Sequence, residues 1–258
     1  MSAFFHKKSL GQHFLQNKEL LEKISKIKEL ENEYVVEIGP GSGFLTEFLL
    51  KEKPKVLTAI EKDLSLKPIL NKIKTKNPKN FNLIFNDALT INLSNLTKKK
   101  IILVGNLPYN IATTLIINWI KNYKIFKSLV VMVQKEVAQR LYAKVGTKFY
   151  SRTSVLIQAN ASVKEKFEVR AENFFPRPKV NSSVIEIIPS RRREFNYESL
   201  DKILKISFLH RRKILKNNLK NLSIEVQKKI NESGINLSSR PQNLKPDEYI
   251  KLSKILFC

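Results

Sequence analysis

Cysteine is almost absent from the chain: Cys258 is its only one in 258 residues. A disulfide within the chain is therefore impossible, and the composition fits a reducing compartment. The sequence also lacks an apolar run of about 18 residues, so we expect no membrane-spanning helix. Residues 1–8 lack the apolar stretch of a secretory signal, and we therefore expect a cytoplasmic protein that does not bind membranes.

Acidic residues are few beside the basic ones. The chain has 23 Asp and Glu against 47 Lys and Arg, which gives a formal net charge of +24. Such a surface attracts polyanions and repels copies of itself, so we expect a monomer whose partner carries many phosphates. Glycine is scarce too, and compositional drift in an AT-rich genome explains part of the lysine excess. Drift does not explain the arginine clusters at Arg191–Arg193 and Arg211–Arg212.

Apolar residues make up 42% of the chain, enough to bury a sizeable core. Short apolar runs alternate with helical patterns, which favours a mainly parallel sheet covered by helices. The expected strands are Tyr34–Ile38, Val56–Ile60, Leu83–Phe85, Ile101–Val104, Leu129–Gln134, Ser154–Ala161 and Ser183–Ile188. The expected helices are Lys18–Lys28, Phe44–Lys51, Leu66–Lys74, Ala112–Lys121 and Lys135–Ala143, with Ser65 capping the third and Pro68 in its first turn.

The alternation of strands and helices stops near Pro189. Beyond it the pattern is helical, with breaks at Gly234 and Pro241. The expected helices are Tyr197–Leu209, Arg212–Leu222, Ile224–Glu232 and Pro246–Phe257. The sequence therefore predicts two domains, an α/β domain over residues 1–190 and a small all-α domain over residues 191–258.

A glycine-rich turn follows the first apolar strand. Gly39, Gly41 and Gly43 allow tight backbone turns and a close approach of a ligand to the main chain. The next strand ends in Glu61, and a carboxylate about 20 positions after such glycines suits the two hydroxyls of a ribose. Nicotinamide dinucleotide sites use similar parts, so an oxidoreductase stays open at this point.

Two details favour a methyl donor over a dinucleotide. The spacing is Gly-x-Gly-x-Gly, and Glu37 just before the turn would place a negative charge near the ligand. That charge would repel a pyrophosphate and attract a cationic amino group or sulfonium. Asp87 follows the third strand and suits the exocyclic amine of an adenine ring.

The fourth strand leads into the turn Asn106-Leu107-Pro108-Tyr109. The amine of adenine is a poor nucleophile, because its lone pair is delocalised into the ring. The side-chain oxygen of Asn106 and the main-chain carbonyl of Leu107 can accept its two protons and localise that lone pair. Pro108 stiffens the turn, and Tyr109 offers a ring on which a base can stack. The turn therefore predicts N-methylation of a base, without a metal.

Several segments together resemble the ribosomal RNA adenine dimethyltransferase family over about residues 6 to 258. They are Lys8–Leu15, Glu37–Gly43, Gly105–Asn110, Gln134–Leu141, Tyr150–Val155, Phe174–Val180, Phe208–Lys213 and Asn217–Leu219. The resemblance implies a Rossmann-like class I S-adenosylmethionine-dependent methyltransferase fold with a seven-stranded, mainly parallel sheet. It also implies that the chain dimethylates adenine amines in small-subunit ribosomal RNA during subunit biogenesis.

The resemblance also assigns roles to residues. It implies that S-adenosylmethionine contacts His13, Leu15, Gly39, Glu61, Asp87 and Asn106, and the glycine turn adds Gly41 to this set. It implies that Asn106 and Tyr109 hold the target base, with Phe174 as a second stacking face. Four positions depart from the family's usual residues: His13 for Asn, Ser151 for Gly, Arg177 for Pro and Asn181 for Asp.

Basic residues of the C-terminal region are the expected RNA-binding surface. Next to a base-modifying site, a cluster of cations favours phosphate contacts that position the RNA. We expect these contacts from Arg191, Arg192, Arg193, Arg211, Arg212, Lys213, Lys216 and Lys220, the three lysines sharing one helix face. The spacing of His6 and His210 suggests no metal site.

Two other functions remain open at this stage. A large-subunit ribosomal RNA adenine methyltransferase of the antibiotic-resistance type shares the glycine turn and the Asn-x-Pro-aromatic turn. A non-catalytic RNA-binding assembly factor could use the same scaffold. The motifs at Lys8–Leu15 and Phe208–Lys213 favour the small-subunit family, and retention of Asn106, Pro108 and Tyr109 favours an active enzyme.

Overall fold

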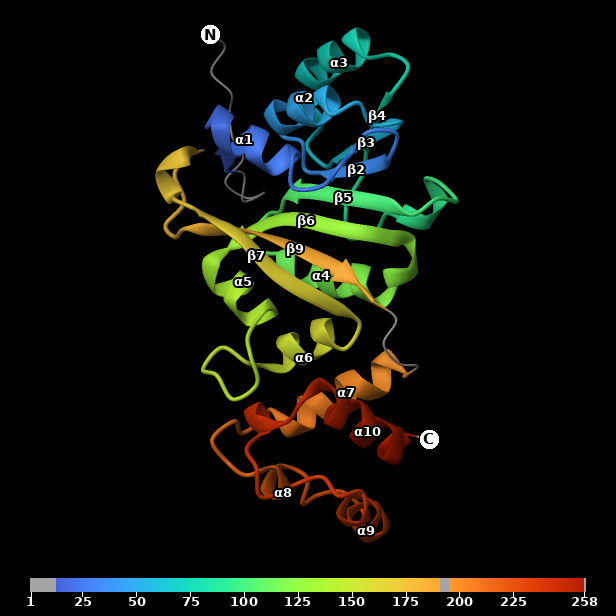
Figure 1. Ribbon diagram of the computed structural model, residues 1–258, viewed down its shortest axis with the longest axis vertical. Coiled ribbons are helices and arrows are strands. Elements are labelled where there is room, and N and C mark those ends of the chain that lie inside the picture. The colour runs from blue at the N-terminus through green and yellow to red at the C-terminus, as the bar shows by residue number, and fades with distance from the viewer. Residues whose placement is uncertain (1–12, 191–194, 258) are drawn as a thin grey trace. The chain divides into compact units, whose positions relative to one another are not determined.

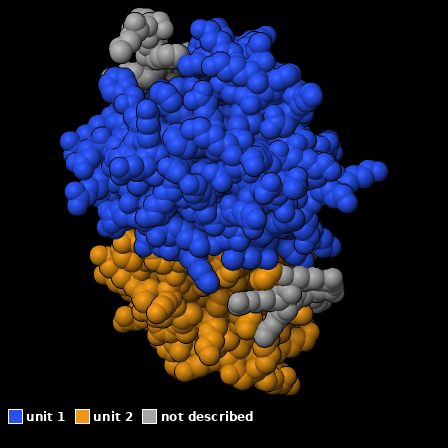
Figure 2. Space-filling model, turned by 45° about the horizontal axis from the view of Figure 1, so that its top comes forward, with its two compact units in different colours: residues 1–138, 164–189 blue, residues 139–163, 190–258 orange. Residues whose placement is uncertain are grey.

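The computed structural model describes residues 13–190 and 195–257. His6, the first part of the N-terminal motif (Lys8–Gln12) and the arginines Arg191–Arg193 lie outside the described residues. The chain divides into two compact units, residues 1–138 with 164–189 and residues 139–163 with 190–258 (Figure 2). Residues 139–163, which precede the predicted boundary at 190, thus cluster with the C-terminal helices, and the assignment of catalytic and RNA-binding domains stays a prediction.

A seven-stranded sheet forms the centre of the first unit, with strand order β4-β3-β2-β5-β6-β9-β7 (Figure 1). Strands β2 to β6 pair in parallel, and β9 runs antiparallel to β6. The strands are β2 (Tyr34–Ile38), β3 (Val56–Glu61), β4 (Phe81–Phe85), β5 (Ile101–Asn106), β6 (Phe126–Gln134), β7 (Ala161–Val169) and β9 (Ser182–Pro189). The prediction of a seven-stranded, mainly parallel sheet is confirmed.

Helices bury both faces of the central strands, which is why these strands are almost wholly apolar. Side chains of β2, β3, β5 and β6 share one core cluster with α1 (Lys18–Ser25), α2 (Phe44–Lys51) and α3 (Lys67–Lys76). The strand order extends from β2 in both directions, so right-handed crossovers place α4 (Ala112–Lys121) on the other face. The short helix α5 (Lys135–Leu141) follows β6 directly.

The register of the parallel strands brings the predicted site residues to one edge. Ile38 pairs with Ile60 of β3 and with Gly105 of β5, and Glu61 pairs with Phe85. The turns that follow β2, β3, β4 and β5 therefore begin at nearly the same level of the sheet. In open sheets of this kind, that edge is where ligands bind.

The sequence pattern did not predict a second sheet, which has two strands. The residues of β1 (Phe14–Leu15) pair antiparallel with those of β8 (Phe174–Phe175). The Nδ2 of Asn17 donates to Oδ1 of Asn173 at 2.9 Å, which joins the same two segments. The described end of the N-terminal motif, His13–Leu15, thus lies beside the Phe174–Val180 motif, about 160 residues away in sequence.

The prediction of a strand at Ser154–Ala161 is wrong. Residues Arg152–Gln158 form helix α6, and the seventh strand, β7, begins only at Ala161. Ser154, Val155, Leu156 and Ile157 are all buried, so the run has no exposed face, and periodicity cannot distinguish a buried helix from a buried strand. The Ser151–Ser154 capping box is the signal that identifies the helix.

Two further predictions about helices are wrong. Helix α8 spans only Leu215–Asn218, so Lys213, Lys216 and Lys220 do not share the face of one helix. Helix α3 begins at Lys67 and has no side-chain cap, and the side chain of Asp63, not Ser65, caps the short 3-10 turn before it. Pro68 does lie in the first turn of α3, as expected.

The second unit is helical, with α7 (Tyr197–Ser207), α9 (Ile224–Glu232) and α10 (Pro246–Phe257) beside α6 and α8. Its interior contains two fully buried tyrosines whose hydroxyls are satisfied by main-chain carbonyls. Tyr150 donates to Leu244 at 3.0 Å, and Tyr249 donates to Pro241 at 2.7 Å. An ion pair between Arg152 and Asp201 joins α6 to α7.

Candidate active site

A cavity of about 200 Å³ opens at the carboxyl edge of the parallel strands. Its wall contains the residues that follow β2, β3, β4 and β5, together with two residues next to or in β1. The lining includes His13, Phe14, Ile38, Gly39, Gly41, Ile60, Glu61, Lys62, Asn86, Asp87, Asn106, Leu107, Pro108 and Tyr109. Most residues predicted from the sequence to bind a cofactor or base therefore surround one space.

The glycine turn is shaped by backbone angles that other residues rarely adopt. Gly39 has φ of 68° and Gly41 has φ of 58°. A Cβ atom at Gly41 would lie 2.6 Å from Cε1 of Phe14, so even an alanine there would have to displace that ring. The turn therefore presents its main chain to the cavity, as the sequence predicts.

Glu61 is held by the main chain around it. Its Oε2 accepts from the N–H of Gly41 at 3.1 Å, and its Oε1 accepts from the N–H groups of Lys62 and Asp63, both at 2.8 Å. Burial raises the pKa of Glu61, and the three N–H donors oppose that rise. Each carboxylate oxygen has two lone pairs, so Oε2 retains an acceptor position for a ligand hydroxyl.

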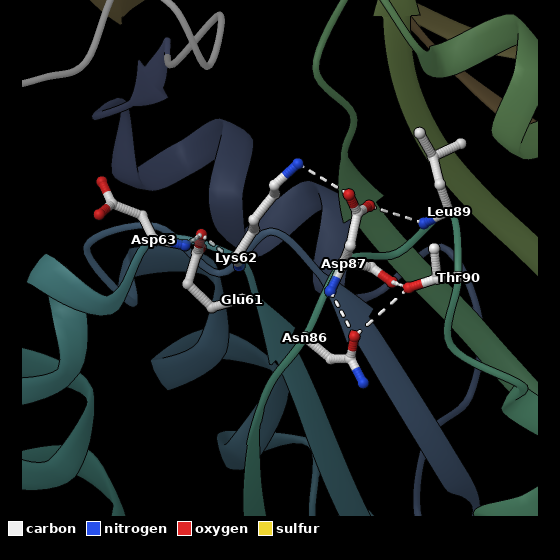
Figure 3. A network of polar contacts seen from close by, with 7 residues as sticks. All are labelled: Glu61, Lys62, Asp63, Asn86, Asp87, Leu89 and Thr90. Atoms are coloured by element: carbon white, nitrogen blue, oxygen red, sulfur yellow. Dashed lines mark hydrogen bonds and ion pairs between the residues drawn. The ribbon is translucent and has the colours of Figure 1, made fainter.

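Asp87 pairs with a lysine that the sequence reasoning did not single out. Nζ of Lys62 lies 2.7 Å from Oδ2 of Asp87, and Oδ1 accepts from the N–H of Leu89 at 2.9 Å (Figure 3). The lysine lowers the pKa of the aspartate, chiefly through this hydrogen bond. Lys62 lines the same cavity, so its ammonium group is part of the polar end of the site.

The expected negative charge at Glu37 is not there near neutral pH. Glu37 is buried, and its Oε2 accepts from the hydroxyl of Thr46 at 2.6 Å. Burial raises the pKa of Glu37 to about 8, so the side chain is mainly neutral at pH 7. Near neutral pH, desolvation thus leaves Glu37 with little of the negative charge that the sequence reasoning assumed, and its attraction of a cationic ligand stays a prediction.

Asn106 and Leu107 offer two acceptor oxygens. The Nδ2 of Asn106 donates to the carbonyl of His13 at 2.7 Å, which turns the amide oxygen Oδ1 to the other side. The N–H of Leu107 donates to Met132 at 3.1 Å. Among residues 13–190 and 195–257, no donor bonds to Oδ1 of Asn106 or to the carbonyl oxygen of Leu107.

Tyr109 is held by contacts from two other segments. Its hydroxyl lies 2.7 Å from Oγ of Ser182, at the start of β9. Its ring stacks on the ring of His13, with centroids 5.3 Å apart and an interplanar angle of 25°. The Nδ1 of His13 in turn donates to the carbonyl of Pro176 at 2.7 Å. Burial raises the pKa of Tyr109, which keeps the phenol neutral.

Two predicted site residues do not line this cavity. Leu15 is buried and borders a neighbouring cavity of about 40 Å³ that also touches Gly39, Glu37 and Asn106. Phe174 is 4% exposed and packs in the core cluster beside Leu15, so stacking on a base would require its side chain to be uncovered. Both roles stay predictions.

The described cations of the predicted RNA surface belong to the second unit. Arg212, Lys213, Lys216 and Lys220 are exposed. Arg211 is exposed as well, but its Nη2 donates to the carbonyls of Lys148 and Tyr150, at 3.1 and 2.7 Å. Arg211 therefore stabilises the turn after α7 in addition to any contact with a phosphate.

Comparison with known families identifies the chain. The family model described as ribosomal RNA adenine dimethylase matches residues 3–257. The chain belongs to that family. A family relative, the ribosomal RNA small subunit methyltransferase A of Pelagibacter ubique (strain HTCC1062), is 41% identical over 253 residues, which cover 96% of this chain and 95% of the relative.

Solved structures show the same fold. A dimethyladenosine transferase from Plasmodium falciparum is 26% identical, has a TM-score of 0.80, and the match covers 93% of this chain and 95% of that one. The 23S rRNA methyltransferase ErmE has a TM-score of 0.71 at 21% identity, over 94% of this chain and 99% of that one. The fold is that of the class I S-adenosylmethionine-dependent methyltransferases.

The described residues contain neither a membrane-spanning helix nor a group of metal-ligating side chains. No helix among them is long and apolar enough to cross a membrane. Residues 13–190 and 195–257 also contain no group of three or more His, Cys, Asp or Glu side chains that could hold a metal ion.

Proposed function

We propose that this chain transfers methyl groups from S-adenosylmethionine to the N6 amines of adenines in small-subunit ribosomal RNA, giving N6-dimethyladenosine during subunit biogenesis. The observation that carries the proposal is the pair of acceptor oxygens, Oδ1 of Asn106 and the Leu107 carbonyl, beside the ring of Tyr109. These groups border the same cavity as the glycine turn. Membership of the adenine dimethylase family supports the same reaction.

The residues around the cavity fit S-adenosylmethionine. The main chain at Gly39 and Gly41 allows close approach, and the remaining acceptor position on Glu61 suits a ribose hydroxyl. Ile38 and Ile60 supply apolar walls, and Asp87 lies at the polar end for the adenine amine. His13 and Leu15 flank the turn. When bound, the cofactor supplies a methyl group on a sulfonium, already activated toward an amine.

The chemistry assigned to the protein is positioning. Oδ1 of Asn106 and the Leu107 carbonyl accept the two amine hydrogens in the first transfer, and one of them accepts the single remaining hydrogen in the second. These bonds draw the nitrogen toward tetrahedral geometry and direct its lone pair, and each transfer releases one amine proton to water. Pro108 restricts the turn. Tyr109 stacks on the base, and stacking of this kind contributes about 1–3 kcal/mol. Correct alignment of the nitrogen with the methyl carbon is the largest contribution, because orientation removes much of the entropic barrier.

The C-terminal cations form the proposed RNA-binding surface. Exposed cations from Arg211 to Lys220, with Arg191–Arg193, contact phosphates of the small-subunit RNA, while the catalytic site holds an unpaired or extruded adenine. Residues 1–190 then form the catalytic domain and residues 191–258 the RNA-binding domain. Phe174 provides the second stacking face once RNA is bound. The protein acts as a monomer in the cytoplasm.

The test is methyl transfer from labelled S-adenosylmethionine to purified ribosomal subunits that lack the modification. We expect label in N6-dimethyladenosine of the small subunit and none in the large subunit, as measured by nucleoside analysis. Label in the large subunit alone would favour the resistance-type function. Binding of small subunits without any methyl transfer would favour a non-catalytic assembly factor, and either result would overturn the proposal.

A further inference from the structure

A buried serine contacts the aromatic ring of the proposed base-binding turn. Ser182 is the first residue of β9, it is 0% exposed, and it pairs with Gln134 of β6. Its Oγ lies 2.7 Å from the hydroxyl of Tyr109, which is 73 residues away in sequence. Ser183, the next residue, is also 0% exposed, but its Oγ has no hydrogen-bond partner within residues 13–190 and 195–257.

The contrast between the two serines indicates that the bond at Ser182 is more than a way to satisfy a buried hydroxyl. The fold tolerates an unpaired hydroxyl at Ser183, on the same strand and at the same depth. At Ser182 the hydroxyl meets the polar end of a ring that belongs to a turn, not to a strand or helix. A turn residue has few main-chain restraints, so side-chain contacts determine where its ring lies.

Two contacts together fix the ring of Tyr109. The stacked ring of His13 covers one face and limits tilting, while the bond to Ser182 at the far end limits swinging about the Cα–Cβ bond. Burial keeps the phenol neutral, so its hydroxyl can both donate and accept in this bond. β9 pairs with β6 from Ser182 to Ile187, so Ser182 is a rigid support.

We propose that Ser182 is a positioning residue that sets the plane of the Tyr109 ring on which the target adenine stacks. It does not touch the reacting atoms. The inference rests on the proposed function, because it assumes that Tyr109 stacks on the target base. If the Tyr109 ring can rotate freely, the adenine amine loses its alignment with the methyl group. The rate of methyl transfer in the bound complex then falls, while the affinity for S-adenosylmethionine is unchanged.

Four variants test the proposal: Ser182→Ala, Ser183→Ala, Tyr109→Phe and the double variant Ser182→Ala/Tyr109→Phe. Loss of one neutral hydrogen bond should lower kcat by about three- to tenfold in Ser182→Ala, with S-adenosylmethionine affinity unchanged. Ser183→Ala, the matched control, should keep the kcat of the original chain. Because both single changes break the same bond, the double variant should be no slower than the slower single variant.

Several outcomes would overturn the proposal. They are an unchanged kcat in Ser182→Ala, an equal loss in Ser183→Ala, and losses in Ser182→Ala and Tyr109→Phe that multiply in the double variant. Unfolding midpoints of the four variants, measured alongside, separate a lower kcat from a lower amount of folded protein.

A second readout does not depend on methyl transfer. In ring-labelled protein without ligand, the Tyr109 signal, assigned by its loss in Tyr109→Phe, should shift in the NMR spectrum of Ser182→Ala and stay in place in Ser183→Ala. An unmoved signal in Ser182→Ala contradicts the positioning role. Absence of methyl transfer by the original chain would instead contradict the proposed function, so the two failures are distinguishable.

Discussion

The two sides of the cavity differ in how their polar atoms are used. On the side of β3 and β4, both carboxylates already have partners: three N–H groups bond to Glu61, and Lys62 with the N–H of Leu89 bonds to Asp87. On the side of β5, Oδ1 of Asn106 and the Leu107 carbonyl have no donor among the described residues.

This difference indicates different roles for the two sides of the cavity. A carboxylate that is held by several donors is rigid and loses little entropy when it binds a ligand hydroxyl. We call the side with Glu61 and Asp87 the cradle side, and the side with Asn106 and Leu107 the acceptor side. Acceptors without a donor in the protein are available to the amine of a base. They lower the barrier to methyl transfer only when that amine is present. Under the proposed function, we therefore expect the cradle side to govern affinity for the cofactor and the acceptor side to govern the rate of methyl transfer.

The largest effect is expected on the acceptor side, from Asn106→Ala. Removing the amide oxygen takes away one of the two acceptors for the adenine amine, and loss of one preorganised group of this kind costs about 100-fold or more in kcat. Binding of RNA should largely survive. The measurement is single-turnover methylation with filter binding of the same RNA, and turnover at the original rate would refute the role of Asn106.

The next largest effect is expected on the cradle side, from Glu61→Ala. Hydrogen bonds to a charged group contribute about 1.5–3 kcal/mol, so affinity for S-adenosylmethionine should fall by about 10- to 100-fold. Glu61→Gln, which keeps the size and one acceptor oxygen, should lose less. Calorimetric titration measures both, and an unchanged affinity in Glu61→Ala would remove the ribose assignment.

A third change tests the buried acid behind the glycine turn. Native Glu37 keeps its proton up to about pH 8, whereas the unfolded chain releases it near the ordinary value of 4.5. Between these values the native state binds more protons, so the contribution of Glu37 to the free energy of unfolding falls as pH rises, by up to about 1.4 kcal/mol per pH unit. Glu37→Gln cannot titrate and should lack this decline.

Urea unfolding of both proteins at intervals from pH 5 to pH 8 measures the difference. The stability of Glu37→Gln relative to the original chain should rise across this range. Two curves that run parallel would show that Glu37 is ionised in the folded protein.

The smallest effect is expected from Lys62→Ala, at the polar end of the cavity. The side chain of Lys62 is 60% exposed, and exposed ion pairs contribute about 0–1 kcal/mol, so cofactor affinity should change by no more than about fivefold. The change should shrink further at high salt, because exposed charges are screened. A loss as large as that of Glu61→Ala would mean that Lys62 belongs to the cradle itself.

The parallel strands and the glycine turn could be predicted from sequence because their signals are local. Each central strand is a buried apolar run, and α2 and α4 begin and end where the sequence predicts. The turns that follow these strands contain Gly39, Glu61, Asp87 and Asn106. Once the strands are known to be parallel, their carboxyl ends must meet at one edge.

The features that sequence reasoning missed depend on contacts between distant segments or on the degree of burial. Nothing near Tyr109 in sequence indicates Ser182, and the pairing of β1 with β8 joins segments about 160 residues apart. The neutral state of Glu37 depends on how completely neighbouring helices exclude water, which a strand pattern does not reveal. The helix at Arg152–Gln158 was missed because all of its central residues are buried.

The most direct test of the account is a crystal structure with S-adenosylhomocysteine and adenosine. We expect the cofactor product between Gly39 and Asn106, its ribose at Glu61, and the adenosine amine about 3 Å from both Oδ1 of Asn106 and the Leu107 carbonyl. Adenosine bound with its amine directed away from these two oxygens, or a cofactor product bound elsewhere, would contradict it.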